Sequence, residues 1–438
     1  MALGLFEELK LPLAETEALI EADRCLECGS AHAPAPCVVA CPADVDVPGF
    51  VAAIARGDTL AAAELIFAEN LLGGTCARVC PAEILCEGAC VLDHEGRPPI
   101  EIARLQRFAA EGALADQVPL RSSAGASGFR VAVLGAGPAG LACAGELAAR
   151  GHDVTVFDEH PEAGGLVRYA IAPYRQLDEP LPAETELIRG LGARIELGRR
   201  VDRAHLRAIA ATNDAVVLAV GLGEDTRVDL LGHDLDGIWE SLPFIEAIKT
   251  GTPPAVGRRV VVIGGGNTAI DVAREALRLG AEEVTVAYRR TEAEMPAYPH
   301  EVEEAREEGV QFAWLTAPAR FLGRLRVEGV ECVRMRLGEP DASGRARPEP
   351  VPGSEHVLPA ETVVAAIGQS PRSELMDWVE GLVFEGARIR VDNATGRTSS
   401  PRFYAAGDAT NGGATAVEAV REGKLAARAV DADLRGTP

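Results

Sequence analysis

The stretch FRVAVLGAGPAGLACAGELAARGHDVTVFD (residues 129–158) contains a β-branched run, a glycine-rich turn, a helix-like segment and a second β-branched run. This order is typical of a βαβ dinucleotide-binding unit. The first glycine permits the tight turn, the second lets the backbone approach a pyrophosphate, and the third lets the helix pack closely. The acidic residue that ends the second strand accepts hydrogen bonds from ribose hydroxyls. The alternative is a βαβ unit whose turn binds nothing. The candidate binding residues are Gly135, Gly137, Pro138, Ala139, Gly140 and Asp158.

A second copy of the pattern, RRVVVIGGGNTAIDVAREALRLGAEEVTVAYRR (258–290), begins 129 residues later. Two such motifs in register, each between a strand and a helix, predict two nucleotide-binding domains. Here the strand ends in Tyr288 and two arginines, which suit a 2′-phosphate and favour NADP over NAD. Alternatively, the arginines are only solvated surface residues. The candidate residues are Gly264, Gly266, Asn267, Thr268, Ala269, Arg289 and Arg290.

Eight of the ten cysteines lie in two groups upstream, in RCLECGSAHAPAPCVVACP (24–42) and GGTCARVCPAEILCEGAC (73–90). Four thiolates hold one iron–sulfur cluster, and a cysteine followed by proline recurs in ferredoxin-type runs. Paired cysteines also build structural zinc sites. Because zinc has no redox role and these groups precede two nucleotide motifs, an iron–sulfur domain is favoured.

Composition narrows the function classes further. The formal net charge of −23 argues against nucleic acid as a partner. The N-terminus lacks the features of a signal peptide, and no apolar run is long enough to span a membrane, so we expect a cytoplasmic protein. Cys143 and Cys332 stand singly and are expected to be buried small side chains. Neither nucleotide motif carries a cysteine pair, which disfavours thiol–disulfide exchange.

These pieces resemble the flavoproteins with two dinucleotide-binding domains, including the glutathione-reductase-like enzymes. The resemblance rests on the two motifs, on AVVLAVG (215–221) and TVVAAIGQSP (362–371) as connectors, and on RFYAAGDATNGGATAVEAV (402–420). It implies FAD at the first motif and NADPH at the second. EAGGLVRY (162–169) would cover the flavin diphosphate, and an aspartate near the C-terminus would bind the ribityl chain. The residues so implicated are Gly165, Leu166, Arg168, Gly368, Gly407, Asp408, Thr415, Ala416 and Val417.

The whole chain resembles the family of small (β) subunits of NADPH-dependent glutamate synthase and the equivalent N-terminal portion of dihydropyrimidine dehydrogenase. Both cysteine groups, IEIARLQRFA (100–109) and AYRRTEAEMPAYPHEVEEAREEGV (287–310) carry this resemblance. It implies two [4Fe–4S] clusters with crossed ligation, leaving Cys76 a non-ligand. The segment between Cys28 and Cys37 is longer than expected for the family and is interpreted as a surface loop. The implied ligands are Cys25, Cys28, Cys37 and Cys90 for one cluster, and Cys41, Cys80, Cys86 and Gln106 for the other.

The predicted fold is α/β, with two Rossmann-like domains of the glutathione-reductase type after an α-helical iron–sulfur domain. The expected boundaries are 1–121 for the cluster domain, 122–128 for a flexible linker, 129–245 and 367–438 for the FAD domain, and 246–366 for an inserted NADPH domain.

The predicted function is an NADPH-oxidising electron-transfer subunit of the glutamate synthase type, in a hetero-oligomer with an FMN-containing catalytic subunit. Alternatives are the matching subunit of a two-subunit dihydropyrimidine dehydrogenase, and an NADPH:ferredoxin-type oxidoreductase. A rival from another class is a zinc-stabilised nucleotide-binding scaffold. Hydride transfer to flavin needs no general acid or base, so no catalytic side chain is predicted.

Overall fold

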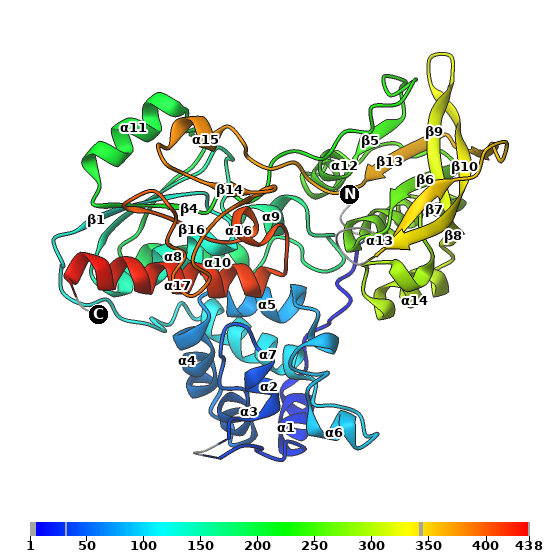
Figure 1. The fold of residues 1–438 in the computed structure, drawn as a ribbon. Coiled ribbons are helices and arrows are strands. Elements are labelled where there is room, and N and C mark those ends of the chain that lie inside the picture. The colour runs from blue at the N-terminus through cyan, green and yellow to red at the C-terminus, as the bar shows by residue number, and fades with distance from the viewer. Residues whose placement is uncertain (1–5, 31–32, 341–344, 437–438) are drawn as a thin grey trace. The chain divides into compact units, whose positions relative to one another are not determined.

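The computed structural model describes residues 6–30, 33–340 and 345–436, and the chain divides into two compact units. Unit 1 comprises Gly223–Ser370 with Tyr169–Tyr174 and, among the described residues, Phe6 and Glu7. Unit 2 holds the rest, namely a helical part (residues 8–121) and a first Rossmann part (122–168, 175–222 and 371–436). Figure 1 shows the elements of both units by label.

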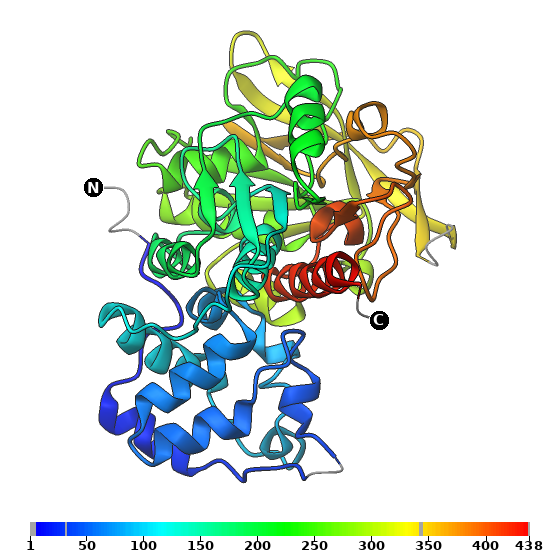
Figure 2. The same cartoon turned by 90° about the vertical axis from the view of Figure 1, so that its left-hand side faces the viewer.

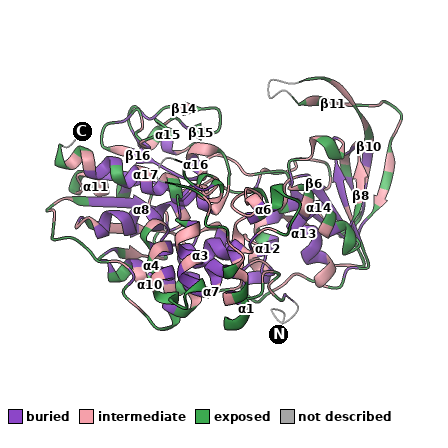
Figure 3. Ribbon diagram, turned by 90° about the horizontal axis from the view of Figure 1, so that it is seen from below, coloured by how far each residue is buried: buried purple, intermediate pink, exposed green. Residues whose placement is uncertain are grey.

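The helical part is built from short helices connected by tight turns. Aspartates begin two of them, because Asp46 and Asp58 accept hydrogen bonds from the backbone amides of Gly49 and Ala61. Its core side chains come mainly from α3, α4 and α7, and Figure 3 shows α3 as mostly buried. The elements are α1 (Glu15–Asp23), α2 (Pro36–Val39), α3 (Val47–Ala55), α4 (Thr59–Glu69), α5 (Gly73–Val79), the 3₁₀ helix η2 (Ala82–Ile84), α6 (Val91–His94) and α7 (Ile102–Ala115).

The first Rossmann part has a parallel five-stranded sheet in the order β16-β4-β1-β2-β3. Its central strands are fully buried runs of Val, Ala and Leu, as parallel strands covered on both faces require. The strands are β1 (Arg130–Leu134), β2 (Asp153–Phe157), β3 (Arg194–Glu196), β4 (Ala215–Leu218) and β16 (Phe403–Ala405).

Helices cover this sheet, and the hairpin of β14 (Phe384–Glu385) and β15 (Arg388–Ile389) completes the part. The helices α8 and α17 pack against each other, and Figure 2 shows α17 in red above the blue helical part of the same unit. The helices are α8 (Pro138–Ala149), α9 (Leu166–Tyr169), α10 (Leu181–Gly190), α11 (Arg203–Thr212), α15 (Leu375–Trp378), α16 (Asp408–Asn411) and α17 (Ala416–Arg435).

Unit 1 contains a second parallel sheet in the order β5-β13-β6-β7-β8. Its core also includes Phe6, Ala172 and Tyr174, from the two short segments that belong to this unit. The elements are β5 (Ile238–Glu240), α12 (Ser241–Lys249), β6 (Arg259–Gly264), α13 (Asn267–Arg278), β7 (Glu283–Tyr288), η3 (Glu292–Glu294), α14 (Pro299–Glu307), β8 (Gln311–Trp314) and β13 (Thr362–Ala366).

An antiparallel sheet stands beside the parallel one in unit 1. The long strand β10 (Val327–Pro340) pairs with β9 (Thr316–Gly323), β11 (Ala346–Pro350) and β12 (His356–Pro359). Cys332 lies on β10 and is fully buried, as is Cys143 on α8, in agreement with the expectation for single cysteines.

Unit 1 extends beyond the range 246–366 expected for the inserted domain. Strand β5 lies at residues 238–240 and pairs with β13, which draws the preceding chain into unit 1.

The segment 122–128 is mostly exposed, and backbone hydrogen bonds connect it to the first Rossmann part. Ala124 and Ser127 donate backbone hydrogen bonds to Ala149 and Gly151 on the turn that follows α8.

Among the residues placed by the structure, no single helix is long and apolar enough to cross a membrane. One bent pair, α4 with α5, meets the length and composition criteria across an 87° bend.

Candidate cofactor-binding sites

The first glycine turn leaves open space only at its middle glycine. A Cβ on Gly135 (φ +104°) would lie 2.2 Å from the carbonyl oxygen of Ala219, and a Cβ on Gly140 would lie 1.9 Å from that of Gly135. Gly137, the residue before the first turn of α8, has only the Cα of Gly165 nearby, 3.8 Å from an added Cβ. The turn therefore fits a pyrophosphate approached closely by backbone.

Two segments distant in sequence close over this turn. The backbone amide of Gly164 donates to the carbonyl of Ala136 (2.7 Å), and a Cβ on Gly165 would lie 2.9 Å from the Cα of Gly137. Gly407 precedes α16, and a Cβ on it would lie 2.9 Å from the Cβ of Ala139. The residues predicted to bind the flavin thus converge on the first turn.

The remaining residues predicted for this site lie at helix starts. Leu166 begins α9, and Arg168 on the same helix pairs with the carboxylates of Glu162 and Asp178. Ala416 and Val417 form the first turn of α17, and Thr415 caps it. The Thr415 hydroxyl accepts from the amide of Glu418, and the Glu418 carboxylate accepts from the amide of Thr415.

The surroundings of Asp158 and Asp408, two carboxylates predicted for the flavin site, shift their pKa values in opposite directions. Burial alone would raise the pKa of Asp158, but hydrogen bonds from His160 and from the amide of Ala136 outweigh it and lower the pKa. Burial raises the pKa of Asp408 to about 6, and the negative charge of Glu422 adds to the shift. The surroundings of Asp158 therefore favour its ionised form, whereas those of Asp408 disfavour it.

The second glycine turn repeats the geometry with a more open surface. A Cβ on Gly264 (φ +151°) would lie 2.2 Å from the carbonyl oxygen of Ala366, whereas a Cβ on Gly266 would meet no atom within 4 Å. Asn267 begins α13 and its Oδ1 accepts from the amide of Tyr298 (2.9 Å). Thr268 is exposed, Ala269 is buried, and Gly368 (φ +103°) follows β13.

The two arginines after β7 are not equivalent. Arg289 is exposed, while Arg290 is 4% exposed and its Nε donates to the carbonyl of Ala346 at 2.9 Å. From the sequence, both arginines were expected either to bind a 2′-phosphate or to be solvated surface residues. In the structure this hydrogen bond joins Arg290 to the start of β11, and Arg289 remains exposed.

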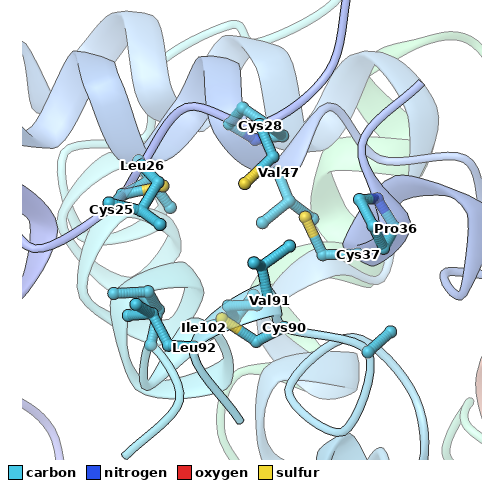
Figure 4. A pocket seen from close by; sticks show the side chains of 14 residues that line it. Cys25, Leu26, Cys28, Pro36, Cys37, Val47, Cys90, Val91, Leu92 and Ile102 are labelled. Atoms are coloured by element: carbon cyan, nitrogen blue, oxygen red, sulfur yellow. The ribbon is translucent and has the colours of Figure 1, made fainter. Parts of the chain in front are cut away.

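Four predicted cluster ligands, Cys25, Cys28, Cys37 and Cys90, line one pocket and are called the first cysteine group below (Figure 4). The space inside measures about 410 Å³, part of it open to solvent. Burial raises the pKa of the Cys37 thiol to about 11, and the charge of Cys25 adds to the shift. Cys37, which follows the long segment after Cys28, lies with the other three. Four thiolates around one space are the donor set of a [4Fe–4S] cluster.

The other predicted thiol ligands, Cys41, Cys80 and Cys86, form the second cysteine group. A hydrogen bond that the Cys80 thiol donates to Cys76, together with burial, raises the pKa of Cys80, and the charges of Cys86 and Cys41 contribute further. Burial raises the pKa of Cys86, with contributions from the charges of Glu87 and Cys41. Cys76 is buried beside this group on α5. Cys41, Cys80 and Cys86 are therefore close enough for their charges to affect one another's pKa.

Gln106 lies on α7 and is 9% exposed. Its Nε2 donates to the carbonyl of Gly73, at the start of α5, at 2.6 Å. This bond fixes the orientation of the amide and leaves its oxygen as the group available to a metal. Within the ranges that the structure describes, no three His, Cys, Asp or Glu side chains form a site for a single metal ion.

Two known protein families match this chain, one over the Rossmann domains and the other over the helical part. The pyridine nucleotide-disulphide oxidoreductase family matches residues 129–423, and the dihydropyrimidine dehydrogenase domain II, 4Fe-4S cluster family matches residues 3–118. The glutamate synthase [NADPH] small chain of Escherichia coli K12 is 38% identical, over 96% of this chain and 92% of its own. The chain belongs to the glutamate synthase small-chain family of pyridine nucleotide-disulphide oxidoreductases.

Proteins with other names are also similar to this chain in sequence or in fold. The NADP(+)-dependent formate dehydrogenase subunit beta of Moorella thermoacetica is 39% identical, over 92% of this chain and 60% of its own length. Mycobacterium tuberculosis FprA, solved in complex with NADPH, has the same fold, with a TM-score of 0.59 at 22% identity over 70% of this chain and 85% of FprA.

Family membership confirms the predicted fold class and the general function. The chain is an NADPH-dependent oxidoreductase with FAD- and NADP-binding Rossmann domains and a 4Fe–4S domain, and it acts in electron transfer.

Sequence reasoning missed three charged residues close to the second cysteine group. Lys10 Nζ donates to the carbonyl of Cys80 (2.9 Å), and Lys424 Nζ donates to the carbonyl of Ala43 (2.9 Å). Glu184 accepts hydrogen bonds from the start of α5. The scarcity of lysine, three among 43 basic residues, was the only available signal, and it gives no position.

Proposed function

We propose that the chain is the NADPH-oxidising subunit of a glutamate synthase-type complex and carries two [4Fe–4S] clusters. The observation that carries the proposal is the pocket lined by four cysteines from two separate sequence groups. The near end-to-end similarity to a glutamate synthase small chain supports the choice of complex.

In this proposal the first Rossmann part holds FAD and unit 1 holds NADPH. The turn at Gly137 and the start of α8 receive the flavin pyrophosphate, Asp158 holds the ribose, and Asp408 holds the ribityl chain. Gly266 and the start of α13 receive the NADPH pyrophosphate, and Arg289 binds the 2′-phosphate. The start of α17 at Thr415 faces the pyrimidine edge of the flavin.

Each cysteine group supplies the ligands of one cluster. Cys25, Cys28, Cys37 and Cys90 hold the first cluster; Cys41, Cys80, Cys86 and the Oε1 of Gln106 hold the second. Contacts between the helical part and the first Rossmann part involve chain next to the second group, at Ala43, Gly74 and Thr75. We therefore assign electron exchange with the flavin to the second cluster, and exchange with a partner to the first.

A bound flavin supplies the conversion between a hydride pair and single electrons, which the clusters accept one at a time. Each NADPH yields NADP⁺, one proton and two electrons. The chain contributes binding and positioning and no acid–base side chain. The proposed terminal acceptor is an FMN-containing large subunit, because the chain is similar almost end to end to a small chain of glutamate synthase.

The test is anaerobic purification with iron, acid-labile sulfide, zinc and flavin quantified, followed by NADPH titration in a spectrophotometer. About eight irons and eight sulfides per chain are expected for two four-iron clusters, with flavin bleaching on NADPH. Stoichiometric zinc without sulfide would contradict the proposal.

The partner is identified by affinity capture from the native host under anaerobic conditions. Recovery of an FMN protein that makes glutamate from 2-oxoglutarate and glutamine supports the glutamate synthase assignment. Recovery of a pyrimidine-reducing FMN protein, or efficient reduction of ferredoxin alone, favours the corresponding alternative.

A further inference from the structure

The helical part and the first Rossmann part of unit 2 meet around two buried charged side chains. Glu184, on α10, is fully buried, and Lys424, on α17, is 6% exposed. Both come from the Rossmann part and both form hydrogen bonds to main chain of the helical part. Burying such groups is unfavourable unless their hydrogen bonds are satisfied, so their partners fix how the two parts dock.

Glu184 binds the beginning of α5 with both carboxylate oxygens. Its Oε1 accepts from the backbone amides of Gly74 (2.7 Å) and Thr75 (3.1 Å), and its Oε2 accepts from the Thr75 hydroxyl (2.5 Å). The approach is close, because a Cβ on Gly74 would lie 2.9 Å from Cγ of Pro180. The carboxylate therefore specifies both the position and the rotation of α5.

The anchored helix leads directly to the second cysteine group. Cys76 lies on α5 and Cys80 is the residue that ends it. The carbonyl of Gly73, at the first residue of α5, accepts the Gln106 amide. A change in how Glu184 holds α5 would therefore move Cys80 and Gln106 together.

Lys424, on the C-terminal helix, anchors the loop that carries Cys41, another thiol of the group. Its ammonium donates to the carbonyl of Ala43 (2.9 Å), two residues after Cys41, and to the carboxylate of Glu69 (2.7 Å). One residue before it, a Cβ on Gly423 would lie 2.2 Å from the carbonyl oxygen of Ala139, at the start of α8. Helix α17 therefore contacts both the first glycine turn and the loop that carries Cys41.

We propose that Glu184 and Lys424 are positioning residues for electron transfer between the flavin site and the second cysteine group. They hold Cys41, Cys80 and Gln106 at a fixed separation from the first glycine turn, and electron transfer rates fall steeply with separation. This inference rests on the proposed function, because it requires a flavin at that turn and a cluster at the second group. The step moves one electron at a time, oxidising the flavin and reducing the cluster.

The test compares four single variants of the cofactor-loaded protein. Glu184→Gln and Lys424→Gln remove the anchoring groups with little change of size. Glu186→Gln, on the same helix as Glu184 with its side chain 67% exposed, and Arg421→Gln, exposed on α17, are the matched controls. Rapid mixing with NADPH under anaerobic conditions follows flavin bleaching and cluster reduction as separate phases, and rapid freezing quantifies the reduced clusters by EPR.

We expect the two anchoring variants to keep wild-type iron, sulfide and flavin and the wild-type rate of flavin bleaching. Cluster reduction is expected to slow about tenfold or more, because small misplacements are costly in positioned reactions. Hydrogen–deuterium exchange is expected to accelerate at α5 in Glu184→Gln and around Ala43 in Lys424→Gln. Glu184→Asp, which keeps the carboxylate, is expected to restore part of the rate. Both controls are expected to match wild type.

Wild-type cluster reduction in both anchoring variants would overturn the proposal while leaving the proposed function intact. Loss of iron from either variant would also overturn it, since the residue would then serve cluster assembly. If NADPH fails to reduce the clusters of the wild-type protein, the proposed function itself fails.

Discussion

The two glycine turns of this protein have the same sequence pattern and different surroundings. At the first turn, Gly165 and Gly407 approach Gly137 and Ala139 so closely that a Cβ on either would lie 2.9 Å from them. At the second turn, a Cβ on Gly266 would meet no atom within 4 Å. Two distant segments thus approach the middle of the first turn, whereas at the second turn the segment Ala297–Tyr298 contacts only the flanking residues Gly265 and Asn267 and leaves Gly266 open.

This difference suits a cofactor that stays and a nucleotide that leaves. The segments over the first turn come from residues 162–169 and 402–435, and α17 is held in turn by the Lys424 contact with the helical part. Enclosure removes more of the ligand from water and slows its release, whereas an open turn permits exchange in every catalytic cycle. The glycine motif indicates a dinucleotide-binding site. The segments that pack on the motif determine how long the bound nucleotide stays.

The largest effect is expected from Gly140→Ala. The added Cβ would lie 1.9 Å from the carbonyl oxygen of Gly135, so α8 must shift away from the turn. Overpacking of this kind costs roughly 3 kcal/mol. If the whole cost weakens flavin binding, the affinity for flavin falls about a hundredfold. We expect nearly flavin-free protein with almost no NADPH oxidation, measured by flavin released on denaturation and by steady-state assay.

The equivalent position of the second turn is Ala269, which supplies the control. Ala269→Gly removes a methyl group that the turn already accommodates, and costs at most about 1 kcal/mol of helix stability. Flavin content is expected to stay at the wild-type level. Normal flavin in Gly140→Ala would show that the first turn has no need of glycine at that place.

The next largest effect is expected at the second glycine turn, where NADPH is proposed to bind. Arg289→Ala removes an exposed guanidinium after β7. A charge-assisted hydrogen bond contributes about 1.5–3 kcal/mol, so KM for NADPH is expected to rise about tenfold or more while KM for NADH is unchanged. Arg324→Ala, exposed on the turn between β9 and β10 of the same unit, is the control. Equal changes with both nucleotides would exclude a 2′-phosphate contact.

A smaller effect is expected from pH at the interface that supports the enclosed site. Burial raises the pKa of Glu184 to about 7 from 4.5, although hydrogen bonds from Thr75 and Gly74 and the charge of Arg78 oppose the shift. A raised folded-state pKa means that the stabilising contribution is complete below pH 4.5 and is lost as pH rises through about 7. Between pH 6 and pH 8 we expect a loss of about 1.4 kcal/mol.

The measurement is the melting temperature at the two pH values, followed by circular dichroism. The wild-type value is expected to fall by a few degrees from pH 6 to pH 8. In Glu184→Gln the difference in melting temperature between pH 6 and pH 8 should be smaller than in the wild type. In Glu186→Gln, where the replaced side chain is mostly exposed, the difference should be unchanged. An unchanged pH dependence in Glu184→Gln would assign the effect to another group.

The sequence predicted what depends on local pattern. Strand, turn and helix at both glycine motifs follow from neighbouring residues, and the structure has them at β1–α8–β2 and β6–α13–β7. The division of the thiols into two crossed groups came from family resemblance, because spacing alone cannot pair residues as distant as Cys37 and Cys90.

Other features depend on contacts that no local pattern encodes. Arg289 and Arg290 are adjacent and chemically identical, and nothing in their local sequence shows that Arg290 is buried and bonded to Ala346 while Arg289 is exposed. Strand β5 has three residues, too few for a recognisable alternation, so the sequence does not show that the chain before α12 pairs with β13. Glu184 has an ordinary helical sequence context, and its role depends on α5, more than a hundred residues away.

The smallest effect tests how rigidly α17 must begin beside the enclosed site. Thr415→Ala removes the hydroxyl of the capping box with Glu418, which costs about 1 kcal/mol. The backbone amides at Ala416 and Val417 remain, so we expect a slightly lower melting temperature with nearly normal flavin content. Thr268→Ala, exposed in the first turn of α13, should change neither quantity. A large loss of flavin in Thr415→Ala would mean that the hydroxyl itself binds the cofactor.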